Sequence, residues 1–344
     1  MKIFITGGSG FLGINLVRKL LHKGHEVVSF DTQPFDYPER DRVEHVMGDI
    51  REKDVLALAM RGSDWIVHAA AALPLNSDEE IYSVDIDGTR NVIEAAVSLG
   101  IKRFVHISST AVYGVPKIGG MKEDSPLVGV GPYGKAKIEA ERIVAGFRDK
   151  VTATVLRPKS FIGPERLGVF SLLYDWASLG LHFPIPGHGN NLYQYLDVED
   201  LCDAIYLALT CESSIANDTY NVGAREFGSF RSDFQTVLDR AGFGKKVRRF
   251  PVGPVLGILR LLDKLGWSPL YPWVYETAVK DSFVSIDRAV EKLKWSPKFS
   301  NSEALIRNYD WYVSHKADFS AQSGTTHRVP WKQGALGVAK IFFR

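Results

Sequence analysis

Residues 1–158 alternate short apolar runs with stretches in which apolar residues recur at helical spacing. The runs consist largely of Val, Ile and Phe without polar alternation, which is typical of strands covered by helices on both faces. Because strand, helix and strand follow one another, the pattern predicts an α/β fold built on a doubly wound parallel sheet. The expected strands are 2–6, 26–30, 43–49, 64–70, 102–109 and 152–158, and the expected helices include 12–24 and 88–100.

The regular pattern fades from about residue 170 onwards, where Pro and Gly become frequent, as in 182–191 and 250–257. We therefore predict a sheet domain over residues 1–169, to which later strands return from the second half of the chain. A smaller C-terminal lobe over residues 170–316 is expected to be interleaved with it and to bind the substrate. Residues 317–344 lose periodicity and are predicted to form a C-terminal extension.

The composition is ordinary for a soluble protein, with 45% hydrophobic and 24% charged residues in a chain of 344. The net charge of +2 gives no sign of a nucleic-acid partner. A strand expected from Lys2 leaves no room for a targeting segment, and no apolar run is long enough to span a bilayer. Cys202 and Cys211 lie in no CxxC or metal-ligand spacing, so we interpret both as structural thiols of a cytoplasmic protein. The nine histidines form no HxH or HExxH pattern, so no metal site is predicted.

The stretch FITGGSGFLG places Gly7, Gly10 and Gly13 between an expected strand and an expected helix. A helix N-terminus presents unpaired N–H groups and partial positive charge, which attract phosphate. Glycines let the backbone turn sharply and let a pyrophosphate approach closely. The spacing is GxxGxxG, so the glycines alone are a weak signal, but the strand before and the helix after them are those of a dinucleotide cradle.

Asp31 ends the second expected strand and favours NAD over NADP as the cofactor. A carboxylate at this place accepts hydrogen bonds from the adenosine ribose hydroxyls and repels a 2′-phosphate. The alternative is a plain strand-to-helix turn with Asp31 as a loop carboxylate, which the context makes the weaker interpretation.

Tyr133 and Lys137 lie four residues apart on a helical pattern and therefore share one helix face. A lysine ammonium beside a phenol favours the phenolate, so we expect the tyrosine pKa to fall below its usual value of about 10. Such a tyrosine can exchange a proton with a secondary alcohol or ketone near neutral pH. Ser109 follows the end of another expected strand, where ligands bind in open α/β sheets, and its hydroxyl could position the substrate oxygen.

In this order the motifs resemble those of the extended short-chain dehydrogenase/reductases, the NAD-dependent epimerase/dehydratase family. The resemblance covers roughly residues 1–315 and implies a Rossmann fold that binds NAD in its N-terminal domain. The motifs are TGGSGFLG, Asp31, GDI (48–50), HAAA (68–71), SSTAVYG, Tyr133-xxx-Lys137, LRPKSFIGP (156–164), YLDVEDLCDAI (195–205), YNVG (220–223) and VEKLKWSPKFS (290–300).

The resemblance also implies a role for each matching residue. Tyr133 would be the catalytic acid and base, Lys137 would hold the nicotinamide ribose, and Ser109 would orient the substrate oxygen. Asp49 and Ile50 would contact adenine, and the run Ala69, Ala70 and Ala71 would pass under the dinucleotide. The full set implied to bind NAD is Gly7, Gly10, Phe11, Leu12, Gly13, Asp31, Asp49, Ile50, Ala69, Ala70, Ala71, Tyr133, Lys137, Pro158 and Ser160.

The chain departs from the family pattern beside the catalytic serine. Dehydratases of the family place an acidic residue just after it, whereas Ser109 is followed by Thr110 and Ala111. Neither side chain is an acid or base for elimination, which argues against a dehydratase and leaves epimerisation or simple oxidation and reduction. Asp85 stands where the family usually has Asn, and because a carboxylate only accepts hydrogen bonds, one bond towards the cofactor is in doubt.

A second departure concerns the substrate. Members that act on nucleotide sugars usually carry an arginine that grips the diphosphate, and Tyr193 stands at that place. A later arginine is also missing, with only Lys280 nearby. The candidate substrate residues are Thr110, Tyr193, Asn191 and His188, although a surface position without function is the favoured interpretation for His188.

The leading hypothesis is a nucleotide-sugar epimerase that transfers a hydride through NAD at a secondary carbinol. The alternative is an oxidoreductase acting on a hydrophobic alcohol or ketone, like 3β-hydroxysteroid dehydrogenases or dihydroflavonol reductases. A non-enzymatic scaffold is a third, weaker hypothesis. The expected partner is a small-molecule substrate, and a homodimer is a further possibility. The segment 245–267 is basic and apolar, and together with the end of the tail it could contact a membrane surface. The preferred interpretation of this segment is a lobe helix packed on the core.

Overall fold

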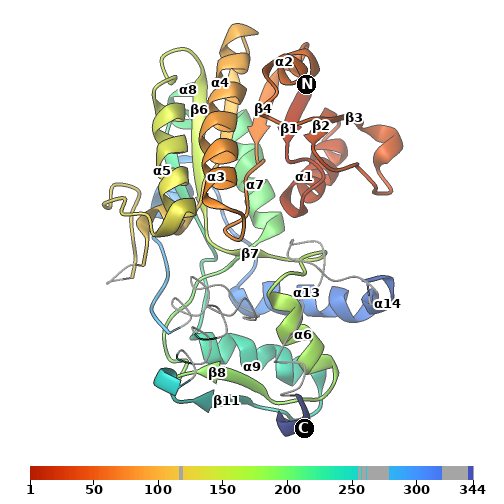
Figure 1. The fold of residues 1–344 in the computed structure, drawn as a ribbon, viewed down its shortest axis with the longest axis vertical. Helices are drawn as coiled ribbons and strands as arrows, with labels where there is room; N and C mark the ends of the chain where they lie inside the picture. The colour runs from red at the N-terminus through yellow and green to blue at the C-terminus, as the bar shows by residue number, and fades with distance from the viewer. Residues whose placement is uncertain (116–118, 255–256, 258–260, 262–278, 320–339, 344) are drawn as a thin grey trace.

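A seven-stranded sheet, in the order β10-β6-β5-β4-β1-β2-β3, forms the upper half of the molecule (Figure 1). The computed structural model describes residues 1–344 except 116–118, 255–256, 258–260, 262–278, 320–339 and 344. Every pair of neighbouring strands is parallel, so the prediction of a Rossmann-type doubly wound sheet is confirmed. The strands are β1 (Lys2–Thr6), β2 (Glu26–Asp31), β3 (Glu44–Met47), β4 (Trp65–His68), β5 (Arg103–Ile107), β6 (Thr152–Pro158) and β10 (Thr219–Val222).

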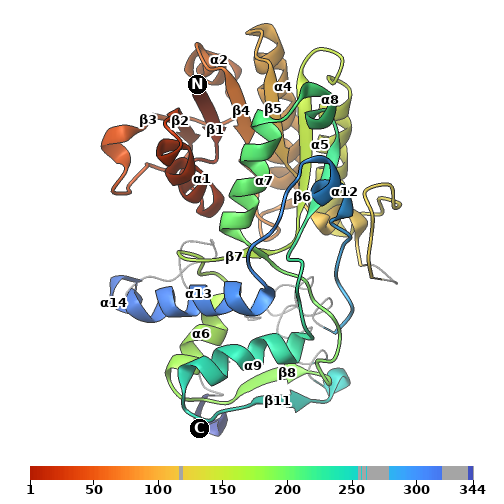
Figure 2. The same cartoon turned by 180° about the vertical axis from the view of Figure 1, so that it is seen from behind.

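Helices cover both faces of this sheet, which explains why its strands read as continuous apolar runs. One face carries α1 (Phe11–His22) and α7 (Val198–Thr210), and the other carries α2 (Lys53–Met60), α4 (Thr89–Ser98) and α5 (Gly131–Ala145) (Figures 1 and 2). In β1 the consecutive residues Ile3, Phe4 and Ile5 are all fully buried, because their side chains alternate between the two covered faces.

The helix expected over 88–100 begins earlier than predicted. Its segment starts with α3 (Asp78–Tyr82), passes through a π-helical turn (Ser83–Gly88) and continues as α4. A π-helical turn inserts an extra residue into the helix and often occurs at functional sites. Asp85 lies on this turn.

The lower half holds α6 (Phe170–Ser178), α9 (Phe230–Ala241) and α13 (Asn301–Ser314) around an apolar core rich in aromatic residues (Figure 1). The short parallel pair β7 (Phe161–Ile162) and β9 (Leu196–Asp197) lies between the halves, and a second parallel pair, β8 (Phe183–Pro186) and β11 (Val247–Phe250), lies at the far end. The remaining elements are α8 (Ser213–Ala216), α12 (Asp287–Lys292), α14 (Lys316–Phe319) and the 3-10 turns Arg40–Arg42, Thr110–Tyr113 and Lys340–Phe343.

The chain crosses between the two halves several times. After α6 and β8 it returns to the sheet through α7 and β10, so residues beyond 170 supply both a covering helix and an edge strand. The carboxyl end of β6 leads directly into β7 at the boundary between the halves (Figure 1). Since ligands of open α/β sheets bind outside the carboxyl ends of the strands, the site is expected at this boundary.

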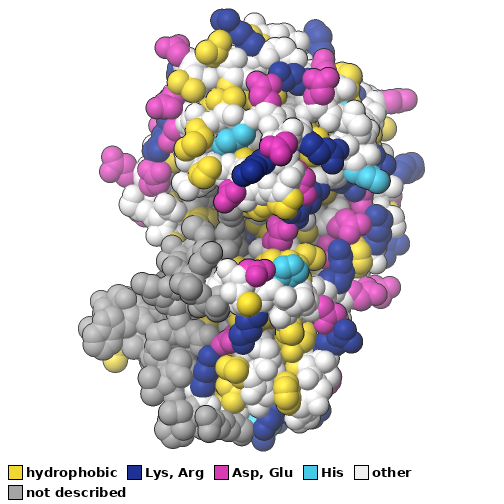
Figure 3. All heavy atoms as spheres, turned by 90° about the vertical axis from the view of Figure 1, so that its right-hand side faces the viewer, with side chains coloured by type: hydrophobic (Ala, Val, Ile, Leu, Met, Phe, Trp, Pro, Cys, Tyr) yellow, Lys and Arg dark blue, Asp and Glu magenta, His cyan; other side chains and the backbone are white. Residues whose placement is uncertain are grey.

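Charges of both signs are interspersed on the face shown in Figure 3, as the small net charge suggests. Within the described ranges, no helix is long and apolar enough to cross a membrane. The segment 245–267 is described only in part, because residues 255–256, 258–260 and 262–267 lie outside the described residues. The last described turn, Lys340–Phe343, packs on the lower half, where the His182 backbone N–H donates to the Phe343 carbonyl at 2.8 Å.

Candidate active site

The loop between β1 and α1 has the shape of a phosphate cradle. Gly7 has a φ of 74°, and a Cβ added there would lie 2.8 Å from the Ala70 backbone nitrogen. A Cβ on Gly13 would lie 2.2 Å from the Gly7 carbonyl oxygen, so only glycine allows the loop and helix to approach this closely. The N-cap residue Gly10 gives α1 no side-chain cap, and the helix N-terminus keeps N–H groups for an anion. These residues fit the pyrophosphate of a dinucleotide.

Asp31 lies at the carboxyl end of β2, beside this loop. Its carboxylate accepts hydrogen bonds from the backbone N–H groups of Ser9 at 3.0 Å and Gln33 at 2.9 Å. A carboxylate offers about four lone-pair sites, so two such bonds fix its orientation and leave acceptors for ribose hydroxyls. The position therefore fits NAD, as the sequence predicts.

The other residues implied to bind NAD differ in their exposure and in their contacts. Ala69 and Ala70 are in close contact with Gly7, and Ala71 is exposed beside them. The Asp49 carboxylate accepts from the Arg51 guanidinium, and this contact lowers the pKa of Asp49. Ile50, Leu12 and Pro158 are buried, Phe11 is buried against the ring of Phe161, and Ser160 is partly accessible.

The helix α5 places Tyr133 and Lys137 on one face, at the edge of the site. The Lys137 ammonium lies 5.6 Å from the centroid of the Tyr133 ring. The Ser109 side chain is near enough to the same phenol to lower its pKa. Ser109 follows the end of β5 and caps the turn Thr110–Tyr113 by accepting from the Ala111 N–H at 3.1 Å. This cap holds the Ser109 oxygen in place and leaves its O–H free to donate.

The expectation that Lys137 brings the phenol pKa below its usual value is wrong for the net shift. Burial raises the pKa of Tyr133 by more than the Lys137 charge and the Ser109 hydrogen bond lower it. The lysine acts in the predicted direction, but a sequence pattern gives no measure of the burial that opposes it.

Asp85 is the acidic residue that faces Lys137, and both side chains are buried. The Asp85 Oδ1 accepts from Lys137 Nζ at 3.4 Å and from the Ala72 N–H at 3.2 Å, while Oδ2 is buried without a hydrogen-bond partner among the described residues. Burial lowers the pKa of Lys137, but the charges of Asp85 and Tyr133 raise it by more, so the pKa of Lys137 is raised overall. Burial raises the pKa of Asp85. The Lys137 ammonium and the Ala72 N–H both donate to Asp85 Oδ1, and this geometry fits an ionised Asp85 paired with a charged Lys137.

Replacing Asp85 by Asn is expected to move the pH profile of catalysis to lower pH. The Asp85 charge raises the pKa of Tyr133, so its removal makes the basic phenolate form available at lower pH. The measurement is the acidic limb of kcat/KM for alcohol oxidation against pH. Asp87→Asn, on the exposed side of the same turn, is the matched control and should leave that limb in place. If the acidic limb of the Asp85 variant stays in place or moves to higher pH, the Asp85 charge does not raise the pKa of Tyr133.

Glu141 continues the face of α5 that carries Tyr133 and Lys137, and sequence analysis missed it. It forms a buried ion pair with Arg157 of β6, with Nη2 and Oε2 2.6 Å apart, and it also accepts from the Ser108 hydroxyl. Arg157 further donates to the Tyr113 hydroxyl at 2.8 Å. The signal was available, because Glu141 lies four residues after Lys137, as Lys137 does after Tyr133.

The candidate substrate residues lie in different environments. Thr110 is partly accessible and lines a pocket, whereas Tyr193 is buried with its ring against Tyr195 and Phe230. Asn191 donates to the Lys280 carbonyl at 3.0 Å, and His188 is exposed. Among the described residues, no group of three or more His, Cys, Asp and Glu side chains could hold a metal ion.

A parallel doubly wound sheet with a glycine loop, an acidic residue after β2 and a Ser/Tyr/Lys set at the strand ends defines the class of NAD-dependent Rossmann enzymes. The sequence profile of the "NAD dependent epimerase/dehydratase family" matches residues 3–223. The chain belongs to this family, and NAD is its cofactor.

Relatives of two kinds resemble the chain. It is 34% identical over 345 residues to "Uncharacterized protein y4nG" of Sinorhizobium fredii, covering 99% of this chain and 86% of the relative. It is 28% identical over 340 residues to "3 beta-hydroxysteroid dehydrogenase/Delta 5-->4-isomerase" of Mycobacterium tuberculosis, covering 91% of this chain and 90% of the relative. The solved structure of UDP-glucose 4-epimerase from Thermotoga maritima has a TM-score of 0.77 at 22% identity and covers 92% of this chain and 100% of its own.

Proposed function

We propose that the protein catalyses NAD-dependent hydride transfer at a secondary alcohol or ketone. The observation that carries the proposal is the convergence of Ser109, Tyr133 and Lys137 at the strand ends, beside the glycine loop. The chemistry that bound NAD supplies is the exchange of a hydride with the reacting carbon.

The protein side chains handle the oxygen of the substrate. Tyr133 accepts the hydroxyl proton as the carbinol becomes a ketone and returns it in the reverse direction. The Ser109 O–H donates to the substrate oxygen and so fixes its position relative to the phenol. Lys137 stabilises the phenolate form, because its ammonium lies over the ring.

The leading form of this function is epimerisation of a nucleotide sugar. Ser109 is followed by Thr110 rather than an acid, so only the hydride and one proton need to move. The fold shared with UDP-glucose 4-epimerase supports an arrangement in which NAD is retained, but at 22% identity it supports no substrate. In this form the ketone turns in the site and is reduced on its other face, so no net oxidation occurs.

The second form is net oxidation or reduction of a hydrophobic alcohol or ketone. Tyr193 favours it, since a buried phenol occupies the place where nucleotide-sugar enzymes carry a diphosphate-binding arginine. The similarity to a 3β-hydroxysteroid dehydrogenase supports the same form.

A substrate panel tests the proposal and separates its two forms. The purified protein is incubated with NAD and either UDP-sugars or hydroxysteroids, and reduced nicotinamide absorbance and product stereochemistry are followed. Inversion without lasting absorbance identifies an epimerase, and stoichiometric absorbance identifies a dehydrogenase. Saturable NAD binding without turnover of any panel member would count against the proposal and favour a scaffold. The homodimer, the membrane contact and the cytoplasmic location are predictions from the sequence.

A further inference from the structure

Lys159 is a buried lysine that meets no carboxylate among the described residues. It follows β6, and only 4% of the residue is exposed. Its ammonium donates to the Ser282 hydroxyl at 2.7 Å and lies 5.1 Å from the centroid of the Tyr193 ring. A hydroxyl and a ring face leave the charge uncompensated, and burial lowers the pKa of Lys159 to about 7.

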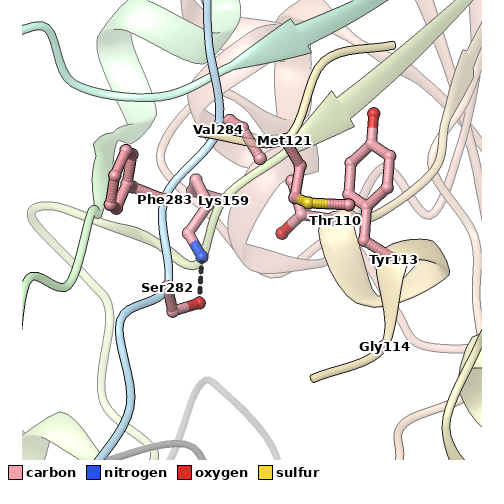
Figure 4. A pocket seen from close by; sticks show the side chains of 8 residues that line it. All are labelled: Thr110, Tyr113, Gly114, Met121, Lys159, Ser282, Phe283 and Val284. Carbon is pink, nitrogen blue, oxygen red and sulfur yellow. Dashed lines mark hydrogen bonds between the residues drawn. The ribbon is translucent and has the colours of Figure 1, made fainter. Parts of the chain in front are cut away.

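Figure 4 shows that Lys159 lines a pocket together with Thr110 and Ser282. Thr110, the residue after Ser109, lines the same pocket, and both residues are partly accessible. The strands that carry them are neighbours, with Ile107 of β5 paired to Leu156 of β6. Lys159 therefore shares this pocket with Thr110, the residue that follows Ser109.

Three chain segments build the surroundings of Lys159. Tyr193 and Ser282 form a parallel bridge, and the Ser282 N–H donates to the Leu192 carbonyl at 2.8 Å. The ring of Tyr193 also packs against Tyr195, 5.0 Å between centroids, so it cannot turn away freely. Ser282 and Tyr193 thus hold one cation beside the residue that stands where the family pattern leads us to expect a diphosphate-binding arginine.

We propose that Lys159 binds a carboxylate carried by the carbon next to the reacting carbinol, which makes β-hydroxy acids and their β-keto counterparts the substrate class. This inference rests on the proposed function and specifies its substrate. A carboxylate would supply the missing anion and accept the unused ammonium donors, in a charge-assisted hydrogen bond. A single ammonium beside Thr110 matches one negative charge close to the reacting carbon, rather than a diphosphate with two.

The affinity for such an anion should depend on pH. Among the described residues, the other titratable groups that line the pocket or contact Lys159 are the phenols of Tyr113 and Tyr193. The pKa of Lys159 is lowered by burial, and no carboxylate of the described part of the chain opposes this effect. As pH rises through about 7, free Lys159 loses its proton and the preference for a carboxylate should decline. A neutral analogue should show no such decline.

The experiment measures equilibrium binding to the NAD-loaded protein for two matched ligand pairs. The pairs are UDP-glucuronate with UDP-glucose, and a 3-hydroxy-4-carboxysterol with the corresponding 3-hydroxysterol. We expect the acid of at least one pair to bind about 10- to 100-fold more tightly than its neutral partner. Lys159→Met should abolish this ratio, whereas Lys280→Met, which removes an exposed lysine of a neighbouring segment, should retain it.

Equal affinities within both pairs, or a ratio that survives Lys159→Met, would overturn the inference. If the methionine variant does not fold, the wild-type ratio between about pH 6 and about pH 9 decides, because only a titrating lysine predicts its decline. Turnover is followed in parallel. Tighter binding of the acid without turnover would contradict the proposed function but support the carboxylate site. Turnover without tighter binding of the acid would support the proposed function but contradict the carboxylate site.

Discussion

Replacing Tyr133 by Phe is expected to lower kcat by about 10²–10⁴-fold while leaving NAD binding largely intact. The phenol is the group of this site that can exchange a proton with the substrate oxygen, and general acid–base catalysis contributes a factor of this size. The ring itself remains and keeps its contact with Lys137. The measurement is single-turnover rate and NAD affinity of both proteins on the same substrate.

The control for this variant is Tyr82→Phe, which removes a phenol hydroxyl from an exposed tyrosine before the π-helical turn. It should retain wild-type kcat. Full activity in the Tyr133 variant would remove the tyrosine from the mechanism. Equal loss of NAD affinity and activity would instead point to a structural role, since the proton-transfer role predicts a change in kcat at constant cofactor binding.

Most of the sheet could be predicted because its strands are covered on both faces. Burial on both sides requires apolar residues at every position, and this gives runs that stand out in the sequence. The edge strand β10 was harder to place, since its four residues, Thr219–Val222, lie among helices of the second half. Its motif YNVG is part of the family resemblance, but only the structure shows that β10 pairs with β6.

The residues of the candidate site also differ in whether the sequence could predict how they lie relative to one another. Residues close in sequence, such as Gly7 with Gly13 or Tyr133 with Lys137, could be predicted because local geometry sets their relation. The surroundings of Lys159 could not be predicted, because Lys159 and Ser282 lie 123 residues apart in the sequence and meet only in the fold. The pKa of Tyr133 also escaped prediction, since it depends on how deeply the folded chain buries the phenol.

The buried Glu141–Arg157 pair connects α5, the helix that carries Tyr133 and Lys137, to the sheet. Arg157 donates to both carboxylate oxygens, with Nε 2.9 Å from Oε1 and Nη2 2.6 Å from Oε2. Each side chain is less than one-tenth exposed, so little water is available to replace a lost partner. Ser108 and Tyr113 join the same network, next to Ser109. The pair thereby fixes α5 against the ends of β5 and β6.

Glu141→Gln is therefore expected to destabilise the protein by about 3–5 kcal/mol, because removing one charge leaves the other buried and uncompensated. Urea unfolding of the NAD-free proteins measures the loss. Glu139→Gln on the same helix is the matched control, since its ion pair with Arg142 is largely exposed and is worth about 0–1 kcal/mol. If the pair acts as a unit, adding Arg157→Met to the Glu141 variant should cost less than Arg157→Met costs alone. Strict additivity, or a loss no larger than that of the control, would show that this network does not hold the helix in place.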